Sequence, residues 1–113
     1  MTPMFIIDDV GTLVYYNEAA ESLLGRLFAD TEQMSSEDWL AEFAPHELDG
    51  SPLVGSTNPL LAALLQRREQ HRSLAIRSAN GQERRIEVSA IPLVGQAERL
   101  LGAVAIFWPA DAT

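Results

Sequence analysis

Residues 11–25, GTLVYYNEAAESLLG, change from a strand pattern to a helix pattern at Asn17. Residues 12–16 are rich in β-branched and aromatic side chains, which favour strands. After Asn17 the apolar residues are spaced by three and four, as on one face of a helix, and Gly25 follows where helices commonly end. Asparagine is a preferred residue at the N-terminal cap of a helix. The stretch therefore predicts a strand at 12–16 that passes directly into a helix at 17–24, with Asn17 as the cap.

The residues before this stretch predict a partner strand. An apolar run begins at Met4 and ends at Asp8-Asp9-Val10-Gly11, which has the composition of a tight turn. Two strand-like segments across such a turn indicate a β-hairpin. We therefore expect a hairpin with strands at 4–8 and 12–16.

Two more helices are expected in the middle of the chain. A pair of serines can cap a helix predicted at 36–43. Asn58 is followed by proline, and this combination of a cap residue with proline at the first helical position predicts a helix at 58–69. Residues 28–35 have mixed composition and are expected to be a loop, and residues 44–57, with two prolines and two glycines, are expected to be irregular with at most one helical turn.

The last third of the chain is predicted to be β. Strands at 71–79 and 82–94 alternate in polarity and are joined by Asn80-Gly81, the dipeptide most specific for hairpins. A final strand follows at 100–108. The order β-β-α-α-α-β-β-β predicts a single α+β domain over residues 1–113, in which helices pack on one face of a five-stranded antiparallel sheet.

Composition and charge narrow the class of protein. The 113 residues are 47% apolar and 21% charged, which is ordinary for a globular domain. The net charge is −8, and residues 1–57 alone carry 11 acidic groups and one arginine. Such an acidic chain repels phosphate backbones, so we expect no nucleic-acid partner.

No apolar run approaches the roughly 20 residues of a transmembrane helix, and the N-terminus lacks the basic start of a secretory signal. We therefore expect no membrane partner and a cytoplasmic location.

Three segments together resemble the PAS domains, small sensory modules of bacterial and eukaryotic signalling proteins. The first, FIIDDVGTLVYYNEAAESLLG, resembles the family's opening hairpin, asparagine and first helix. The second, HRSLAIRSANGQERRIEVSAIPL, resembles its later hairpin, and LLGAVAIFWPADAT resembles its last strand and exit motif. The resemblance covers residues 4–111. Two features depart from it: the family often has a helix before the first strand, and its usual exit motif is Asp-Ile-Thr, where this chain has Asp111-Ala112-Thr113 after Pro109 and Ala110.

The resemblance implies a sensory or protein-interaction module that binds a small cue or a partner and relays it to an effector outside this chain. The family houses its ligands between the sheet and the helices. The inward candidates for such a pocket are Tyr15, Trp39, Phe43, Leu61, Leu64, Leu65, Ile76, Val88, Val104 and Ile106. Because nearly all of them are aliphatic or aromatic, they also describe a filled core, and a ligand-free dimerisation module is the alternative. A ligand, if bound, is expected to be small and apolar, with Tyr15 or Trp39 as its polar contact.

The final strand suggests a second surface. It is apolar on both sides, whereas helices on one face of a sheet leave the other face uncovered. An uncovered apolar face marks an interaction surface. We therefore expect a homodimer, or docking of a flanking segment, through Ile91, Ala103, Ala105 and Phe107.

The sequence carries no recognisable catalytic or metal-binding motif. The chain has no cysteine, which excludes thiolate catalysis and the cysteinyl-flavin chemistry of some PAS relatives. In some haem-binding relatives a histidine on the long helix before the last three strands ligates the iron. Here that helix has no histidine, because His46 precedes it and His71 follows it, so haem is disfavoured. We expect no enzymatic activity and no metal site.

Overall fold

The computed structural model describes residues 1–53 and 57–110, so the Asp111-Ala112-Thr113 exit sequence lies outside the described residues. Its strands form one antiparallel sheet in the order β2-β1-β5-β4-β3. This is the α+β fold class expected from the sequence, with one additional short helix. The elements, in chain order, are β1 (Met4–Asp8), β2 (Leu13–Tyr16), α1 (Glu18–Leu24), α2 (Phe28–Thr31), α3 (Ser36–Phe43), α4 (Pro59–Gln66), β3 (Gln70–Arg77), β4 (Glu83–Val94), the 3-10 turn η2 (Gln96–Glu98) and β5 (Leu100–Pro109).

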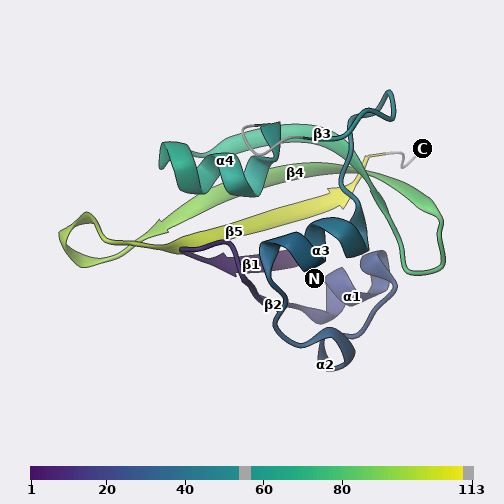
Figure 1. Ribbon diagram of the computed structural model, residues 1–113, viewed down its shortest axis with the longest axis horizontal. Helices are drawn as coiled ribbons and strands as arrows, with labels where there is room; N and C mark the ends of the chain where they lie inside the picture. The colour runs from purple at the N-terminus through teal and green to yellow at the C-terminus, as the bar shows by residue number, and fades with distance from the viewer. Residues whose placement is uncertain (54–56, 111–113) are drawn as a thin grey trace.

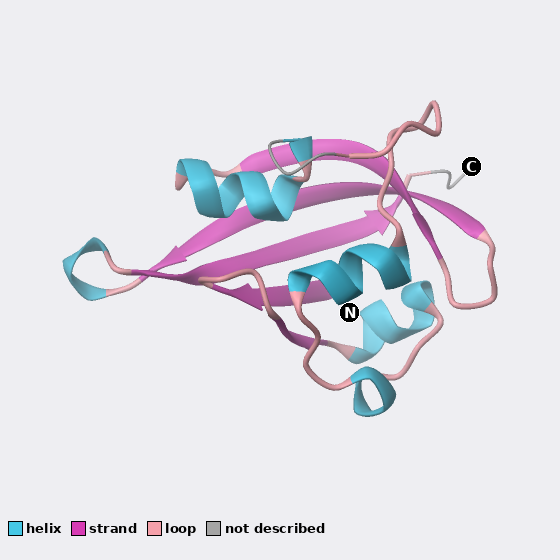
Figure 2. Ribbon diagram, viewed as in Figure 1, coloured by secondary structure: helices cyan, strands magenta, loops and turns pink. Residues whose placement is uncertain are grey.

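The helices divide the sheet into two unlike faces. Helices α1, α3 and α4 lie on the same side of the sheet, with α4 over β3, β4 and β5 (Figures 1 and 2). We call this side the inner face and the opposite side the outer face. The buried core lies between the helices and the inner face. Its strand residues are Phe5, Ile7, Leu13, Tyr16, Leu74, Ile76, Ile86, Val88, Ala90, Ala103, Ala105 and Phe107.

Asn17 joins the first hairpin to the helices. Its Oδ1 accepts a hydrogen bond from the backbone N–H of Ala20 at 3.0 Å, as a helix cap does. The same oxygen accepts from the N–H of Met4 at 3.0 Å, and Nδ2 donates to the carbonyl of Thr2 at 2.9 Å. Asn17 therefore caps α1 and also fastens the start of β1, a second role that the sequence did not indicate.

The helices differ from the expected ones in two places. Residues 28–31, expected as loop, form the single turn α2, where the carboxylate of Glu21 accepts from the N–H of Phe28 at 2.8 Å. This N–H is satisfied by a side chain seven residues away, which a local pattern does not reveal. Helix α4 ends at Gln66, three residues before the expected end, because Arg67 adopts a left-handed conformation with φ 54°.

The inner and outer sides of β5 are the reverse of those expected. In register with β1, Ala103 lies opposite Ile7 and Ala105 lies opposite Phe5, and directly opposed residues share a face of the sheet. Ala103, Ala105 and Phe107 are thus buried in the core, whereas Val104 and Ile106 lie on the outer face and are partly exposed. Because β5 is apolar on both sides, alternation within the strand could not distinguish its two faces.

Gly102 fixes this register by allowing close approach of β1. It lies opposite Asp8 with φ +155°, and a Cβ atom on it would lie 2.1 Å from the carbonyl oxygen of Ile7. A larger residue would therefore push the two strands apart at this point.

Candidate functional site

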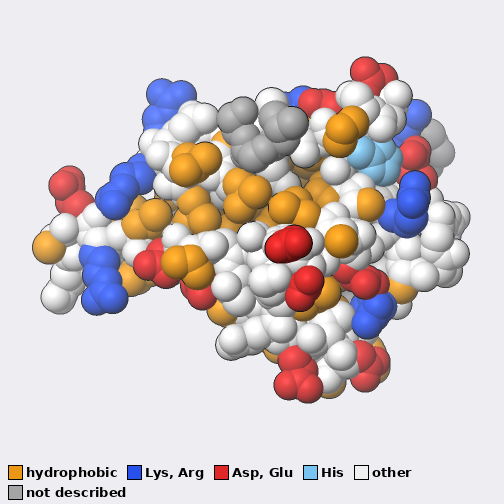
Figure 3. Space-filling model, viewed as in Figure 1, with side chains coloured by type: hydrophobic (Ala, Val, Ile, Leu, Met, Phe, Trp, Pro, Cys, Tyr) orange, Lys and Arg blue, Asp and Glu red, His pale blue; other side chains and the backbone are white. Residues whose placement is uncertain are grey.

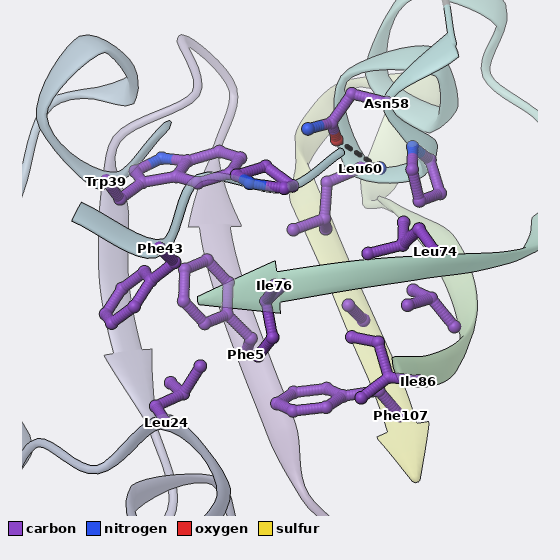
Figure 4. Close-up of a pocket in the computed structure, with 14 residues that line it drawn as sticks. Phe5, Leu24, Trp39, Phe43, Asn58, Leu60, Leu74, Ile76, Ile86 and Phe107 are labelled. Atoms are coloured by element: carbon purple, nitrogen blue, oxygen red, sulfur yellow. Dashed lines mark hydrogen bonds between the residues drawn. The ribbon is translucent and has the colours of Figure 1, made fainter. Parts of the chain in front are cut away.

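A small cavity lies between the inner face and the helices. Its volume is about 60 Å³, and side chains from α3, α4 and four strands converge on it (Figure 4). On the surface above it, hydrophobic side chains gather in a band between α3 and α4 (Figure 3). The lining residues are Phe5, Leu24, Trp39, Phe43, Pro45, Asn58, Pro59, Leu60, Leu74, Ile76, Ile86, Val88, Ala105 and Phe107. None of these side chains is charged, so the cavity favours apolar contents.

The polar groups at the cavity have structural partners. Asn58 is buried, and its Oδ1 accepts hydrogen bonds from the N–H groups of Leu60 and Leu61 at 3.1 and 3.4 Å, which caps α4 (Figure 4). The indole N–H of Trp39 donates to the carbonyl of Gly11 at 2.9 Å. Trp39 therefore lines the cavity with its ring, while its N–H, expected as a polar contact for a ligand, already holds the β1–β2 turn.

Aromatic packing forms the wall beside β1. The ring of Phe5 lies 5.4 Å from that of Trp39 and 6.1 Å from that of Phe43, both edge to face, and stacks 5.9 Å from Tyr16. Such pairs contribute about 0.5–1.5 kcal/mol each beyond area burial. The hydroxyl of Tyr16 donates to the carbonyl of Arg26 at 3.1 Å, and burial raises the pKa of this hydroxyl. This wall is formed by packed aromatic rings and has no group that titrates near neutral pH.

The outer face presents a second, more exposed apolar surface. In register, Met4 lies opposite Ile106, Ile6 opposite Val104, and Ile91 opposite Val104, so these side chains are contiguous across β1, β5 and β4. All five are partly exposed. We call these five residues the outer patch.

A polar network borders the outer patch on β3 and β4. The ring of His71 contacts the hydroxyl of Ser89 at 3.0 Å through Nδ1 and a carboxylate oxygen of Glu87 at 3.2 Å through Nε2. Ser73 donates to the other oxygen of Glu87 at 2.5 Å, and the ring of Trp108 lies 6.1 Å from that of His71. A serine, a histidine and a carboxylate in a row resemble a catalytic triad, but catalysis also requires donors for the developing oxyanion in a site that excludes water. This network lies on an open strand surface, on the face opposite the cavity, and suits a polar rim.

The comparison with protein families decides the identity of the fold. The family model of the PAS fold matches residues 1–111. The chain belongs to the PAS fold family. PAS domains are sensory and signalling modules. No curated protein matches the chain significantly.

Solved PAS structures share this fold at low sequence identity. The LOV domain of a blue-light activated histidine kinase from Erythrobacter litoralis is 19% identical, with a TM-score of 0.74 over 98% of this chain and 97% of that one. The PAS domain of nitrogen regulation protein NR(II) from Vibrio parahaemolyticus is 20% identical, with a TM-score of 0.67 over 96% and 88%. The light-state dimer of the fungal blue-light photoreceptor Vivid is 13% identical, with a TM-score of 0.72 over 95% and 76%. At these identities the likeness shows the fold.

Four of the expected pocket residues line the cavity of this PAS domain. They are Trp39, Phe43, Ile76 and Val88. Leu61 and Leu64 are partly buried and pack against the core without lining the cavity. Helix α4 is apolar on most sides, so the sequence left its rotation undefined. In the structure, Leu60 is the leucine of α4 that lines the cavity.

The remaining expected pocket residues point elsewhere. Leu65 is 75% exposed and Tyr15 is 46% exposed. Tyr15 was expected beside Leu13 on the inner face, but a bulge opposite Ile6 and Ile7 turns Tyr16 inward and Tyr15 outward. Val104 and Ile106 belong to the outer patch. The prediction for these four residues was wrong.

The expected dimer residues are corrected in the same way. Ile91 lies in the outer patch, but Ala103, Ala105 and Phe107 are buried in the core, at 0%, 3% and 4% exposure. The cavity residues that the sequence did not single out include Phe5, Leu60 and Ile86. Their apolar periodicity was visible in the sequence, whereas their convergence on one point depends on the register of distant strands.

The cavity does not fit a large cofactor in this conformation. Sites for drug-sized ligands and cofactors occupy about 300–1,000 Å³, and an apolar cavity of about 150 Å³ binds a molecule as small as benzene. Neither histidine lines the cavity: His71 lies in the polar rim of the outer face, and both ring nitrogens of His46 have hydrogen-bond partners. A haem or flavin therefore does not fit these residues. No helix in the described residues is long and apolar enough to cross a bilayer.

Proposed function

We propose that this PAS domain is a non-catalytic signalling module that works as a homodimer through its outer face and relays a cue to an effector outside this chain. The observation that carries the proposal is the outer patch. Its side chains, such as Val104 and Ile106, are partly exposed, while α1, α3 and α4 all lie on the other face (Figure 2). Contiguous exposed apolar patches mark interaction sites in proteins.

The distribution of charge supports a second copy as the partner. Nine of the 16 acidic residues lie between Glu18 and Asp49, in the segment that carries α1, α2 and α3. Two copies that meet through their outer faces keep most of these carboxylates far from the interface, which reduces the repulsion between two chains of charge −8. One structural neighbour, Vivid, forms a dimer in its light state.

The cavity supports a second candidate for the input of the module. Its lining is uncharged and its volume of about 60 Å³ suits a small apolar molecule of very few heavy atoms. The alternative is a ligand-free dimerisation module with a filled core. The two candidates differ only in whether the cavity binds a ligand. Both share the outer face as the output surface.

The proposal assigns the chain no reaction of its own. In the described residues, no group of three or more His, Cys, Asp or Glu side chains is placed to hold a metal ion. A cytoplasmic location belongs to the same proposal, and the chain has no cysteine and so needs no oxidising compartment to form disulfides.

Sedimentation velocity tests the dimer at tens of micromolar protein. We expect the unmodified chain to sediment as a dimer and Val104→Asp to sediment as a monomer, because the substitution puts a charge at the centre of the outer patch. Circular dichroism of the variant checks that it remains folded.

Leu65→Asp is the matched control. It also adds one negative charge in place of a branched apolar side chain, but Leu65 is exposed on α4, on the other side of the sheet. This variant should remain dimeric. A monomeric unmodified chain, or a Val104→Asp protein that still dimerises, would contradict the proposal.

A further inference from the structure

The segment after α3 is fastened to the edge of the sheet at His46. Its backbone N–H donates to the carbonyl of Ala75 in β3 at 2.8 Å, and its carbonyl accepts from the N–H of Ala75 at 2.9 Å. Strand β3 is the last strand on its side of the sheet, so its outward backbone groups would otherwise lack a strand partner. His46 therefore links α3 to the sheet edge.

The side chain of His46 has an unusual pair of hydrogen-bond partners. Its Nδ1 lies 2.7 Å from the carbonyl oxygen of Ala44, and its Nε2 lies 3.0 Å from a carboxylate oxygen of Glu83, at the start of β4. A carbonyl and an ionised carboxylate both accept and cannot donate. A neutral imidazole has one N–H, whereas the imidazolium ion has an N–H on each nitrogen. Both contacts are therefore satisfied together when His46 is protonated.

We propose that His46 is a proton-operated latch: as an imidazolium ion it holds the Ala44 carbonyl at the end of α3 with one ring N–H and the Glu83 carboxylate of β4 with the other, and loss of the proton releases one of these two hydrogen bonds. The neutral ring would place a nitrogen lone pair against an acceptor oxygen, which is repulsive at these distances. The segment around His46 then keeps one ring hydrogen bond and its backbone pair with Ala75.

The charged groups around His46 agree with this assignment. The hydrogen bond to Ala44 and the Glu83 carboxylate raise the pKa of His46, against smaller opposing effects of burial and of Arg77 in β3. His46 in turn lowers the pKa of Glu83. Glu47, the next residue along the chain, is paired with Arg72 of β3.

The directions of these shifts define the pH range of the latch. Because folding raises the pKa of His46, its contribution is complete below the ordinary value of 6.5 and is lost as the pH rises through the raised value. Because folding lowers the pKa of Glu83, that contribution is lost as the pH falls through the lowered value. The latch is closed between these limits and opens on the alkaline side.

The latch adjoins the cavity wall. Pro45, next to His46, lines the cavity, as do Trp39 and Phe43 of α3. Release of His46 thus loosens the segment that closes the cavity at this end. The inference goes beyond the proposed dimer, since its input is a proton and it requires neither a ligand nor a second copy.

His71 provides an internal comparison. Its Nδ1 contacts the hydroxyl of Ser89, which can donate a proton as well as accept one, so a neutral His71 satisfies both of its contacts. Each histidine has its own carboxylate partner on β4, Glu83 for His46 and Glu87 for His71, and the two differ in the second partner. The latch should therefore operate at His46 and not at His71.

NMR of the ¹⁵N-labelled chain between pH 5 and 9 tests the latch. Long-range imidazole spectra follow the protonation of each histidine, and amide hydrogen exchange follows the protection of the His46 and Ala75 N–H groups. We expect His46 to remain an imidazolium ion at pH 6.5, with both ring nitrogens protonated. Protection of the two amides, corrected for intrinsic exchange, should fall on the same titration, by up to about tenfold for each unit by which the pKa of His46 is raised.

Two matched variants separate the latch from general effects of charge. Glu83→Gln keeps an acceptor oxygen but removes the charge, so the pKa of His46 and the pH of release should both fall. Glu87→Gln makes the same change beside His71 and should leave the release at His46 and Ala75 where it is. The proposal is overturned if His46 is a neutral tautomer at pH 6, if amide protection does not follow its titration, or if the two variants behave alike.

Discussion

The two sides of β5 differ in what covers them, although both are apolar. Ala103, Ala105 and Phe107 point toward the helices and are at most 4% exposed, whereas Val104 and Ile106 alternate with them and remain partly exposed on the outer face. The inner side combines two small residues with one large one. The outer side carries branched aliphatic residues with no helix over them. The difference teaches that apolar character alone does not define the core of this domain.

The free-energy consequences of the two sides differ accordingly. Burial of apolar surface stabilises the fold by about 25 cal/mol per Å², and the inner residues obtain nearly all of this within one chain. The outer residues obtain part of it and can gain the rest when a partner covers them. Substitutions on the inner side should therefore act on folding, and substitutions on the outer side on association.

Phe107→Ala should give the largest effect on folding. The ring of Phe107 is 4% exposed and lines the cavity, so truncation would enlarge an existing void. Deletion of a buried phenylalanine ring costs about 3–5 kcal/mol in the free energy of unfolding. Urea titration followed by circular dichroism measures this value.

Trp108→Ala is the control for this comparison. Trp108 is the next residue in β5 and is 40% exposed on the outer side. At submicromolar protein, where association is weak, its truncation should cost less than half as much as that of Phe107. Equal losses at the two positions would show that the two sides of β5 are not energetically distinct.

The order of elements was predictable from the sequence because its signals are local. The turn at residues 8–11, the cap at Asn17 and the Asn80-Gly81 hairpin each involve neighbours in the chain. The orientation of β5 was not predictable in this way. It depends on the pairing of Phe5 with Ala105, two residues 100 positions apart, and on the close approach that Gly102 permits.

In the candidate site, too, local signals predicted some residues, and contacts between distant parts of the chain decided the others. Trp39 and Phe43 were predictable as cavity residues because they form the apolar side of a well-capped helix. Tyr15 and Leu65 were misplaced because a bulge in the hairpin and the rotation of an apolar helix shift side chains without any local signal. The partners of His46 were also beyond reach, since Glu83 lies 37 positions away.

Asn17→Ala should have the next largest effect, because Asn17 connects the hairpin to the helices that cover the inner face. The substitution removes the cap of α1 and the two hydrogen bonds to the start of β1. Loss of a cap costs about 1 kcal/mol, and the two further bonds raise the expected loss to about 2 kcal/mol. Asn17→Asp keeps the acceptor oxygen for Ala20 and Met4, so urea titration should show a smaller loss for it. Equal losses for the two variants would assign the effect to the Thr2 contact.

Ala105→Val should give the smallest change and the opposite sign. Ala105 lines the cavity, while its direct partner Ala90 is equally buried but does not line it. Two added methyl groups at Ala105 can fill free space, with an expected gain of about 1 kcal/mol in the free energy of unfolding. The same change at Ala90 would overpack the core and should cost about 1–3 kcal/mol.

Xenon, which enters dry apolar cavities, should shift the NMR signals of residues around Ala105 in the unmodified chain and not in Ala105→Val. Destabilisation by both valines, with no xenon response, would mean that the inner side is completely filled and would leave the outer face as the functional surface of the module.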